Sequence, residues 1–549
     1  MEKYPSEQGP EAPRDVKRYA GRILFQAGIS LEQLNIAANE HGLTLPNLGS
    51  IHIQSVAGAI ATGTHGSSLN HGLLSQNVRG LRIVLADGSA VWCSPDDHSD
   101  LFRAALVSLG GIGIITEIEM ELAASCNIEW VQLWEPLDSV IATWNNSLWK
   151  SDEYVRCWWM PYLKRAIVWK AHKTDKALAK PKASWYGGLL GFYIYHTCLT
   201  VAHYIPRLLP TIEWLIMGSQ YGFKTGSKAT AIEPQRTGLL MDCLYSQWVN
   251  EWAIPLRHGP EAITRLSAWI NGDEASSGIP FSSKGLYVHS PVEVRVADGS
   301  TAHTKTRGFM DPSCESEPTL YLNATLYRPY GLDPPCRQRY YQAFEYLMKE
   351  LGGRPHWAKN FATVSHQDLR GMYGENMNRY LEVRGNVDPD GMFVGAWHRR
   401  LVLGEGASSK SEDATTTNIG VAEGQGGVED IPHGSTLSTL NAVAAPSASS
   451  LPLEERLVAT QPRGRAGGVD WIGMQCAEGT SSLGGTAAEI QLVDDDRIVN
   501  GDQEASVLLA RLKRDADVRR VTGESISKDA DEMYKGPLHK TGPGALPVV

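Results

Sequence analysis

The start of the chain alternates between the hydrophobic spacing of strands and that of helices. The run RILFQAG (22–28) predicts a strand. The following run, SLEQLNIAANEHG (30–42), predicts a helix with Ser30 as its N-cap and Gly42 at its C-terminal end. These two elements open an α+β unit that we place at residues 19–126.

A hairpin, a second helix and a long strand complete this unit. VRGLRIVLADGSAVWCS (78–94) predicts a hairpin that turns at Asp87 and Gly88. HSDLFRAALVSLG (98–110) predicts a helix, and GIGIITEIEMEL (111–122) predicts a strand. Strict alternation in that strand predicts one face with Ile114, Thr116, Ile118 and Met120 and the other with Ile115, Glu117, Glu119 and Glu121.

A second α+β unit is predicted over residues 127–403, built around a large antiparallel sheet. Its predicted strands are NIEWVQLWEP (127–136), YVRCWWMPY (154–162), RAIVWKAHK (165–173), GLYVHSPVEVRVA (285–297) and PTLYLNATLYRPY (318–330). Helices are predicted at 260–271 and 336–351.

The segment 186–222 is strongly apolar but is not a clean membrane span, because polar residues and prolines interrupt it. The interrupting residues are His196, His203, Pro206, Arg207, Pro210 and Glu213. Two interpretations stay open: a helical hairpin buried in its own domain, or an amphipathic element that lies on a membrane face.

Both ends of the chain are predicted to be disordered. Residues 1–18 contain no apolar stretch and are too acidic for a transit peptide, so no import signal is visible and an intracellular location is expected. Beyond residue 403 the only Phe, Trp or Tyr residues are Trp471 and Tyr534. The segment 404–549 therefore has the composition of a low-complexity tail, and we assign it no chemistry.

Composition narrows the class of protein. A chain of 549 residues divides into about two to four units, and 42% hydrophobic residues suffice for the core of a globular enzyme. A net charge of -10 argues against a nucleic-acid partner. The 8 Cys form no C-x-x-C pair, which favours free thiols over a disulfide framework or a metal site. Asn323 matches a glycosylation sequon, which we take as chance.

Small residues crowd the segment 55–68, where Gly58, Gly63 and Gly66 alternate with Ala, Ser and Thr. Glycine permits positive φ and removes the Cβ, so successive backbone N–H groups can converge on a phosphate. A tight turn is the competing interpretation. Neither the dinucleotide fingerprint G-x-G-x-x-G nor a P-loop motif is present, which argues against those two nucleotide folds.

The stretch from Leu45 to Gly88, which contains SIHIQSVAGAIATGTHGSSLNHG, resembles the flavin-domain segment of the aldonolactone oxidases. These enzymes, which include L-gulonolactone oxidase, are flavoproteins of the vanillyl-alcohol-oxidase type that bind FAD. The resemblance covers residues 20–402 and rests also on DCLYSQWVNEWAIP (242–255), SPVEVR (290–295), YRPYG (327–331), PHWAKNF (355–361), VDPDGMF (387–393) and WHRR (397–400).

The resemblance implies that the small-residue loop contacts FAD. The residues implied to bind FAD are Ser55, Gly58, Thr62, Gly63, Thr64, His65 and Ile115. Glycines 110, 111 and 113 would let the chain press against the same ring. The alternative for His65 is a hydrogen-bonded histidine of the core.

Glu293 and Arg295 are two residues apart on a predicted strand, so their side chains project from one face. A charge pair on a solvated strand is the common explanation of such spacing. The resemblance implies instead that they bind substrate together with Ser50 and Lys359, with Glu293, Arg295 and Lys359 as the catalytic residues. Glu251 is a weaker candidate, for which a structural role is the alternative.

The implied reaction is FAD-dependent oxidation of an aldono-1,4-lactone, such as D-arabinono-1,4-lactone, at C2 to an ascorbate-type enediol. Oxygen would be reduced to hydrogen peroxide, and the product would belong to ascorbate or erythroascorbate synthesis. Two alternatives stay open: a non-catalytic relative that binds a sugar lactone or a partner without FAD, and an alditol-type flavin oxidase.

The family has a first flavin lobe of about a hundred residues before the matched segment, which the printed sequence lacks. The first 22 residues contain no histidine, so covalent attachment of FAD is not expected. Family members are often associated with mitochondrial or other organelle membranes, and the segment 186–222 would provide such a contact. If the substrate assignment holds, Lys359 must lie near His65 and the Glu293 carboxylate.

Overall fold

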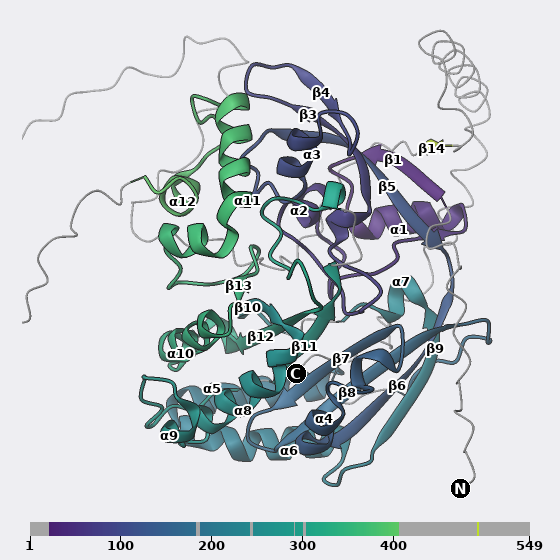
Figure 1. Cartoon of the computed structure of the whole chain (residues 1–549). Helices are drawn as coiled ribbons and strands as arrows, with labels where there is room; N and C mark the ends of the chain where they lie inside the picture. The colour runs from purple at the N-terminus through teal and green to yellow at the C-terminus, as the bar shows by residue number, and fades with distance from the viewer. Residues whose placement is uncertain are drawn as a thin grey trace, which may run out of the picture. The chain divides into compact units, whose positions relative to one another are not determined.

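A computed structural model describes residues 21–182, 187–241, 245–289, 291–299, 304–405 and 491–493 (Figure 1). The segment 1–18 and all of the tail beyond residue 405 except 491–493 lie outside the described residues, so the predicted disorder is not tested there. The described residues belong to one compact unit. The predicted boundary at residue 126 coincides with the passage from the first sheet to the second.

The first sheet has the strand order β14-β1-β5-β3-β4, with β2 beside β5, and every pairing in it is antiparallel. Its strands are β1 (Gly21–Gln26), β2 (Leu43–Thr44), β3 (Val78–Val84), β4 (Ala90–Cys93), β5 (Ile114–Ala124) and β14 (Gln491–Val493). The predicted strand at 22–28 and the hairpin β3–β4 are confirmed.

Three helices accompany this sheet: α1 (Leu31–Glu40), α2 (Val56–Ala61) and α3 (Ser99–Leu106). Ser30 caps α1 as predicted, because its hydroxyl accepts from the Gln33 N–H and the Gln33 side chain accepts from the Ser30 N–H in return. Gly42 follows the helix with a positive φ of 70°, which glycine adopts at little cost.

The predicted alternation along β5 is correct from Ile118 onward and wrong at Ile114. Ile118 and Met120 are fully buried, whereas Ile114 is 59% exposed. The cause is an irregularity in the β3–β5 ladder, where Arg82 pairs with Glu117 but the next residue, Ile83, pairs with Ile115. At this point β5 contains one residue more than β3, which is a β-bulge. Such an insertion moves the side chains on one side of it to the opposite face of the sheet.

The second sheet is also antiparallel throughout, with the order β13-β10-β12-β11-β7-β8-β6-β9. Its strands are β6 (Asn127–Pro136), β7 (Tyr154–Met160), β8 (Arg165–Thr174), β9 (Lys228–Pro234), β10 (Gln247–Pro255), β11 (Val292–Ala297), β12 (Thr319–Tyr327) and β13 (Arg354–Pro355). The predicted large antiparallel sheet is confirmed, although β9, β10 and β13 were not predicted as strands.

The strand predicted at 285–297 is too long, because only Val292–Ala297 is extended into the ladder. Pro291 has no N–H to donate to a neighbouring strand, and Gly285 has a positive φ of 66°. His289 instead contacts β12 through its side chain, since its Nε2 lies 3.1 Å from the Tyr327 carbonyl oxygen. The segment before Pro291 therefore leaves the sheet.

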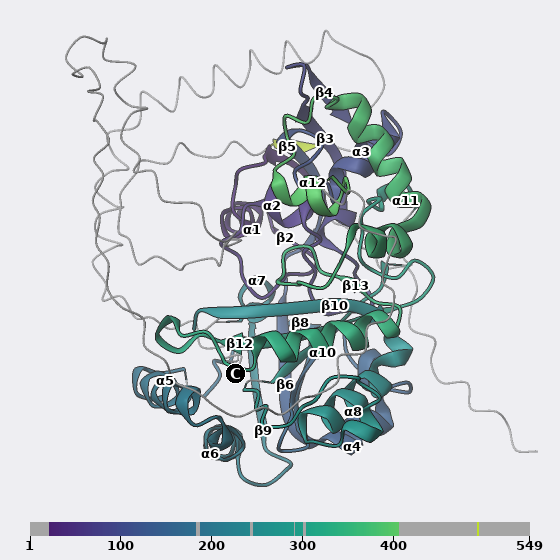
Figure 2. The same ribbon diagram turned by 90° about the vertical axis from the view of Figure 1, so that its left-hand side faces the viewer.

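Helices cover this sheet, and Figure 2 shows α10 lying along β10 and β12. Their bounds are α4 (Leu137–Thr143), α5 (Leu189–Tyr204), α6 (Leu209–Tyr221), α7 (Gln235–Gly238), α8 (Gly259–Ile270), α9 (Glu274–Ser277) and α10 (Arg337–Glu350). The last two helices, α11 (His366–Val387) and α12 (Ala396–Leu401), lie instead beside the first sheet, where α11 packs against α3 (Figure 1). The helices predicted at 260–271 and 336–351 are confirmed as α8 and α10.

The apolar segment 186–222 contains the helical hairpin α5–α6, but the hairpin is not wholly buried. Tyr195 and Ile216 face the core at 2% and 1% exposure. Leu189 and Trp214 are 76% and 51% exposed, so the other face of the hairpin is apolar and uncovered by the described residues. No helix in the described part of the chain is long and apolar enough to cross a membrane.

Candidate functional site

Three polar side chains lie in one row across the middle of the second sheet. Glu251 of β10 is directly opposite Asn323 of β12, which is directly opposite Glu293 of β11. Directly opposite residues share a face of the sheet, so the register itself brings the two carboxylates to one amide. The Asn323 Nδ2 lies 3.3 Å from Glu251 Oε2 and 3.4 Å from Glu293 Oε2.

Glu251 is the centre of this site and is completely buried. Arg295 donates to its Oε1 at 2.7 Å, and the Lys359 Nζ lies 3.3 Å from its Oε2. Burial alone would raise the pKa of Glu251, but the charges of Arg295 and Lys359 and the contact with His65 outweigh it and hold the pKa well below its usual range. Glu251 is therefore an ionised carboxylate between two cations.

His65 joins the small-residue loop to this carboxylate. Its Nδ1 lies 2.8 Å from the Gly66 carbonyl oxygen and its Nε2 lies 3.2 Å from Glu251 Oε1, while its ring stacks on Tyr321 at 3.5 Å. Burial, followed by the charge of Arg295, lowers the pKa of His65. Both ring nitrogens face acceptor oxygens, but a neutral imidazole has only one N–H to donate, so only one of the two contacts can be a hydrogen bond. If the ring took up a second proton, it could donate to both oxygens.

His65, Glu251 and His356 present ligand atoms within 4.8 Å of one another, a spacing at which a metal ion could be held. Arg295 and Lys359 already compensate both oxygens of Glu251, and they would repel a further cation. We therefore interpret the three residues as part of a hydrogen-bonded core rather than as a metal centre.

Two polar atoms of the predicted substrate pair are buried and unused by the described residues. Glu293 Oε1 and Arg295 Nε have no hydrogen-bond partner there, although both side chains are about 95% buried. The Arg295 Nε lies 3.4 Å from Glu293 Oε2 as an ion pair, and the Arg295 Nη1 lies 3.4 Å from Ser50 Oγ. A buried acceptor and a buried donor without partners are rare in folded proteins and are suited to a ligand that supplies both.

The small-residue loop falls into a covered half and an accessible half. A Cβ on Gly66 would lie 2.0 Å from Asn47 Oδ1, and one on Gly63 would lie 3.4 Å from the ring of Pro312. Thr64 and His65 are buried, and the adjoining cavity of about 10 Å³ holds no more than one water. At these positions the chain's own side chains make the close approach that we expected from FAD.

The accessible half fits a flat dinucleotide better. Ser55 and Gly58 are exposed, and Thr62 and Ile115 are half-buried. The Leu109 N–H donates to the Ala61 carbonyl at 3.0 Å, which brings the glycines that precede β5 beside the same loop. Ser55, Gly58 and Thr62 therefore offer FAD an exposed side, and Lys359 is the partly accessible cation of the Glu251 site.

The structure thus brings the predicted substrate residues together through a residue that was ranked low. Lys359, His65 and Arg295 all contact Glu251, and Glu293 joins them through Arg295 and Asn323. Asn323, which the sequence offered only as a chance sequon, is 5% exposed inside β12. Polar residues within otherwise apolar strands were the available signal, for Glu251 among the Trp and Val of β10 and for Asn323 among the Leu and Tyr of β12.

Comparison with protein families gives two adjoining matches. Residues 13–94 match the FAD binding domain, and residues 118–401 match D-arabinono-1,4-lactone oxidase. The second match covers more than half of the chain and contains Glu251, Glu293, Arg295, Asn323 and Lys359.

Several curated relatives are similar over most of their length. A protein of Neurospora crassa is 48% identical over 410 residues, which is 71% of this chain and 73% of the relative. The D-arabinono-1,4-lactone oxidase of Yarrowia lipolytica is 37% identical over 68% of this chain and 80% of its own length. The enzyme of the same name from Saccharomyces cerevisiae is 34% identical over 68% and 79%.

Among solved structures, the chain is similar to the His121Ala mutant of cholesterol oxidase from Brevibacterium sterolicum. The TM-score is 0.56 at 14% identity, over 70% of this chain and 82% of that one. A similarity at this level of sequence identity shows the fold alone. This fold agrees with the predicted flavoprotein architecture.

Proposed function

The chain belongs to the D-arabinono-1,4-lactone oxidase family, and on that premise we propose that it oxidises an aldono-1,4-lactone at C2 to an ascorbate-type enediol. It is an oxidoreductase that depends on FAD. One observation supports the position of the substrate: Glu293 Oε1 and Arg295 Nε are a buried acceptor and a buried donor without hydrogen-bond partners in the described residues, although the Nε also lies 3.4 Å from Glu293 Oε2 as an ion pair. A lactone with neighbouring hydroxyl and carbonyl oxygens supplies both.

Each charged residue has a distinct task in this proposal. Glu293 accepts a hydrogen bond from a substrate hydroxyl, and Arg295 donates to a substrate oxygen. Lys359 offers a fixed positive charge that stabilises negative charge developing on the reacting oxygen. Glu251 contacts both cations and fixes their positions, so it is a positioning residue rather than a catalytic one.

The chemistry removes two electrons and two protons from the lactone, one as the hydroxyl proton and one with the electron pair from C2. FAD, when bound, supplies the acceptor for that electron pair. We propose oxygen as the final acceptor, so that one lactone and one O₂ give one 2-keto lactone and one H₂O₂. The 2-keto lactone then tautomerises to the enediol without any further change of oxidation state.

Substitution at Lys359 and Glu293 tests the site. We expect Lys359→Ala and Glu293→Gln each to lower turnover of D-arabinono-1,4-lactone by at least about a hundredfold, because each removes a charge or an acceptor at the reacting centre. Peroxide formation is the measurement. Lys305→Ala, at an exposed lysine that pairs with Asp96, is the matched control. Near-normal turnover in either site variant would remove that residue from the mechanism.

A substrate panel separates this function from the alternatives. Faster oxidation of polyols than of lactones would favour an alditol oxidase. A folded protein that binds lactone without any flavin would favour the non-catalytic alternative.

We further propose that the outer face of α5–α6 rests on an anionic membrane surface. Leu189, Leu190, Tyr204 and Trp214 are each more than half exposed there. Over residues 176–228 the chain carries six basic residues against one acidic residue, the buried Glu213, although the whole chain is acidic at -10. Exposed apolar side chains on a locally basic segment are typical of interfacial binding. A mitochondrial or other organelle membrane stays a prediction.

Sedimentation with vesicles tests this contact. We expect binding to vesicles that contain phosphatidylserine, weaker binding to pure phosphatidylcholine, and release by high salt, because part of the attraction is electrostatic. Leu190→Ser combined with Trp214→Ser should release the protein. The control is Ile36→Ser combined with Met392→Ser, two exposed apolar residues elsewhere. Equal binding of both double variants would contradict the assigned face.

A further inference from the structure

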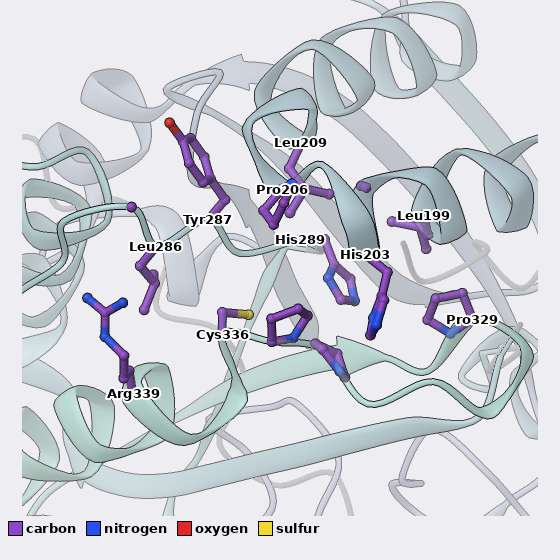
Figure 3. A pocket seen from close by; sticks show the side chains of 14 residues that line it. Leu199, His203, Pro206, Leu209, Leu286, Tyr287, His289, Pro329, Cys336 and Arg339 are labelled. Atoms are coloured by element: carbon purple, nitrogen blue, oxygen red, sulfur yellow. The ribbon is translucent and has the colours of Figure 1, made fainter. Parts of the chain in front are cut away.

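A cavity of about 170 Å³ lies away from the lactone site (Figure 3). It is enclosed by the α5–α6 hairpin, the segment before β11 and the segment after β12. One wall comes from α5, the turn after it and α6, another from residues 285–289, and a third from residues 329–339. None of its lining residues belongs to the candidate site around Glu251. The cavity is therefore a separate place for a ligand.

Most of the cavity wall is apolar, with Leu199, Leu209, Leu286 and four prolines contributing to it. A sugar in this space would leave some of its hydroxyl groups facing hydrocarbon without partners, which is costly. An apolar cavity of about 150 Å³ is large enough for a benzene ring. The volume and the apolar lining together favour one small aromatic ring.

Two imidazoles, His203 from α5 and His289 from the segment before β11, add polar atoms to this wall (Figure 3). Burial lowers the pKa of His289 to about 4, so its ring is neutral at neutral pH. Its Nε2 must donate, because the atom 3.1 Å away is the Tyr327 carbonyl oxygen. The Nδ1 of His289 is therefore unprotonated and can accept a hydrogen bond. Among the described residues, no group donates to it.

His203 contributes a second unused atom, because its Nδ1 is buried with no partner in the described part of the chain. A hydroxyl group can donate one hydrogen bond, so it can use the acceptor on His289.

The other polar lining groups do not favour an anion or a covalent ligand. Arg339 already donates from one nitrogen to the carbonyl oxygens of Ser282 and Lys284. Burial raises the pKa of the Cys336 thiol to about 12, so it is protonated and unreactive at neutral pH. A neutral ligand with one hydrogen-bond donor fits the wall best.

We propose that this cavity binds the ring of a phenol-class molecule, with the ring against the leucines and prolines and the hydroxyl donating to His289 Nδ1. The site is independent of lactone oxidation, because the two share no residue. One wall of the cavity is the inner side of the α5–α6 hairpin, whose other face exposes apolar residues.

Binding of phenol and toluene to the full-length protein tests the proposal, since the two rings match in size and only phenol can donate. The measurement is the dissociation constant of each compound by calorimetry or ligand-observed NMR. We expect both to bind, and we expect His289→Phe to shift the ratio of the two constants against phenol by about tenfold, which is the value of one hydrogen bond. Ala202→Phe should fill the cavity and remove binding of both compounds. His258→Phe, at a histidine outside the cavity, is the control that should change neither constant.

Peroxide formation from D-arabinono-1,4-lactone should stay unchanged in His289→Phe, which also shows that the variant is folded. An unchanged phenol-to-toluene ratio in this variant would overturn the proposed hydrogen bond. Absence of phenol binding to the wild-type protein at millimolar concentration would overturn the site itself.

Discussion

At the scale of single residues, the molecule concentrates its charge chemistry on one fully buried carboxylate. Glu251 compensates Arg295 and Lys359 and also contacts His65, so three cationic or titratable side chains depend on its position. A buried ion pair gains little net stability, but removal of one partner leaves the other charge buried and uncompensated. Glu251 is thus the residue whose loss the site can least tolerate.

We therefore predict that Glu251→Gln affects both stability and catalysis. Arg295 and Lys359 would lose their shared counter-charge, and the free energy of unfolding should fall by about 3–5 kcal/mol. Turnover of the lactone should fall by at least about a hundredfold, because both cations would lose their fixed positions. Denaturant titration and peroxide formation are the measurements.

Glu261→Gln is the control for this prediction, because Glu261 pairs with Arg265 on the exposed side of α8. A surface pair of this kind is worth under about 1 kcal/mol. If Glu251→Gln were as stable and as active as this control, Glu251 would not hold the cations in place.

At the scale of elements, α6 is anchored by a buried acid. Glu213 of α6 accepts the backbone N–H groups of Tyr162 and Leu163 at 3.0 and 3.2 Å, and its second oxygen has no partner among the described residues. Burial raises the pKa of Glu213 to about 8, so the folded protein holds it protonated at neutral pH. The helix that carries the exposed Trp214 is therefore fixed to the turn between β7 and β8 by a neutral carboxyl group.

This anchor predicts a specific dependence of stability on pH. Because the pKa of Glu213 is higher in the folded state than in the unfolded state, its contribution is fully present below pH 4.5 and is lost as the pH rises through 8. We expect the difference in the free energy of unfolding between the wild type and Glu213→Gln to change by about 4 kcal/mol over that range. The wild type should become less stable relative to the variant as the pH rises.

Unfolding of both proteins in urea at several pH values measures this difference. The matched control is Glu382→Gln, at an exposed glutamate of α11. A difference between wild type and Glu213→Gln that does not change with pH would contradict the protonated anchor.

At the scale of the whole molecule, the family assignment predicts that the chain is stabilised by its cofactor. Residues 13–94 match a FAD binding domain, and the exposed side of Ser55, Gly58 and Thr62 is open to a flat ligand. We expect FAD at a hundredfold excess over its dissociation constant to raise the free energy of unfolding by about 2.7 kcal/mol. The bound protein should also show flavin absorbance that persists through gel filtration.

Thermal unfolding with and without FAD measures the stabilisation, and riboflavin, which lacks the phosphates, is the control ligand. A correctly folded, colourless protein that FAD leaves unchanged would support the non-catalytic alternative instead.

The sequence by itself determined the local elements and the family. The Ser30 N-cap, the Asp87–Gly88 hairpin and the strands β6 to β8 follow from the conformational preferences of neighbouring residues, which a linear pattern contains. Resemblance to the aldonolactone oxidases likewise supplied Glu293, Arg295 and Lys359 from short motifs.

Only the tertiary structure decided which residue stands at the centre. Glu251, Glu293 and Asn323 lie on three strands, and the antiparallel register that aligns them depends on pairing between distant segments, which no local pattern encodes. The same holds for Gly66, whose lack of a side chain is required by the Asn47 side chain packed against it. Spacing along the chain predicts the secondary structure of a segment, whereas the pairing of distant segments decides which side chains meet in the site.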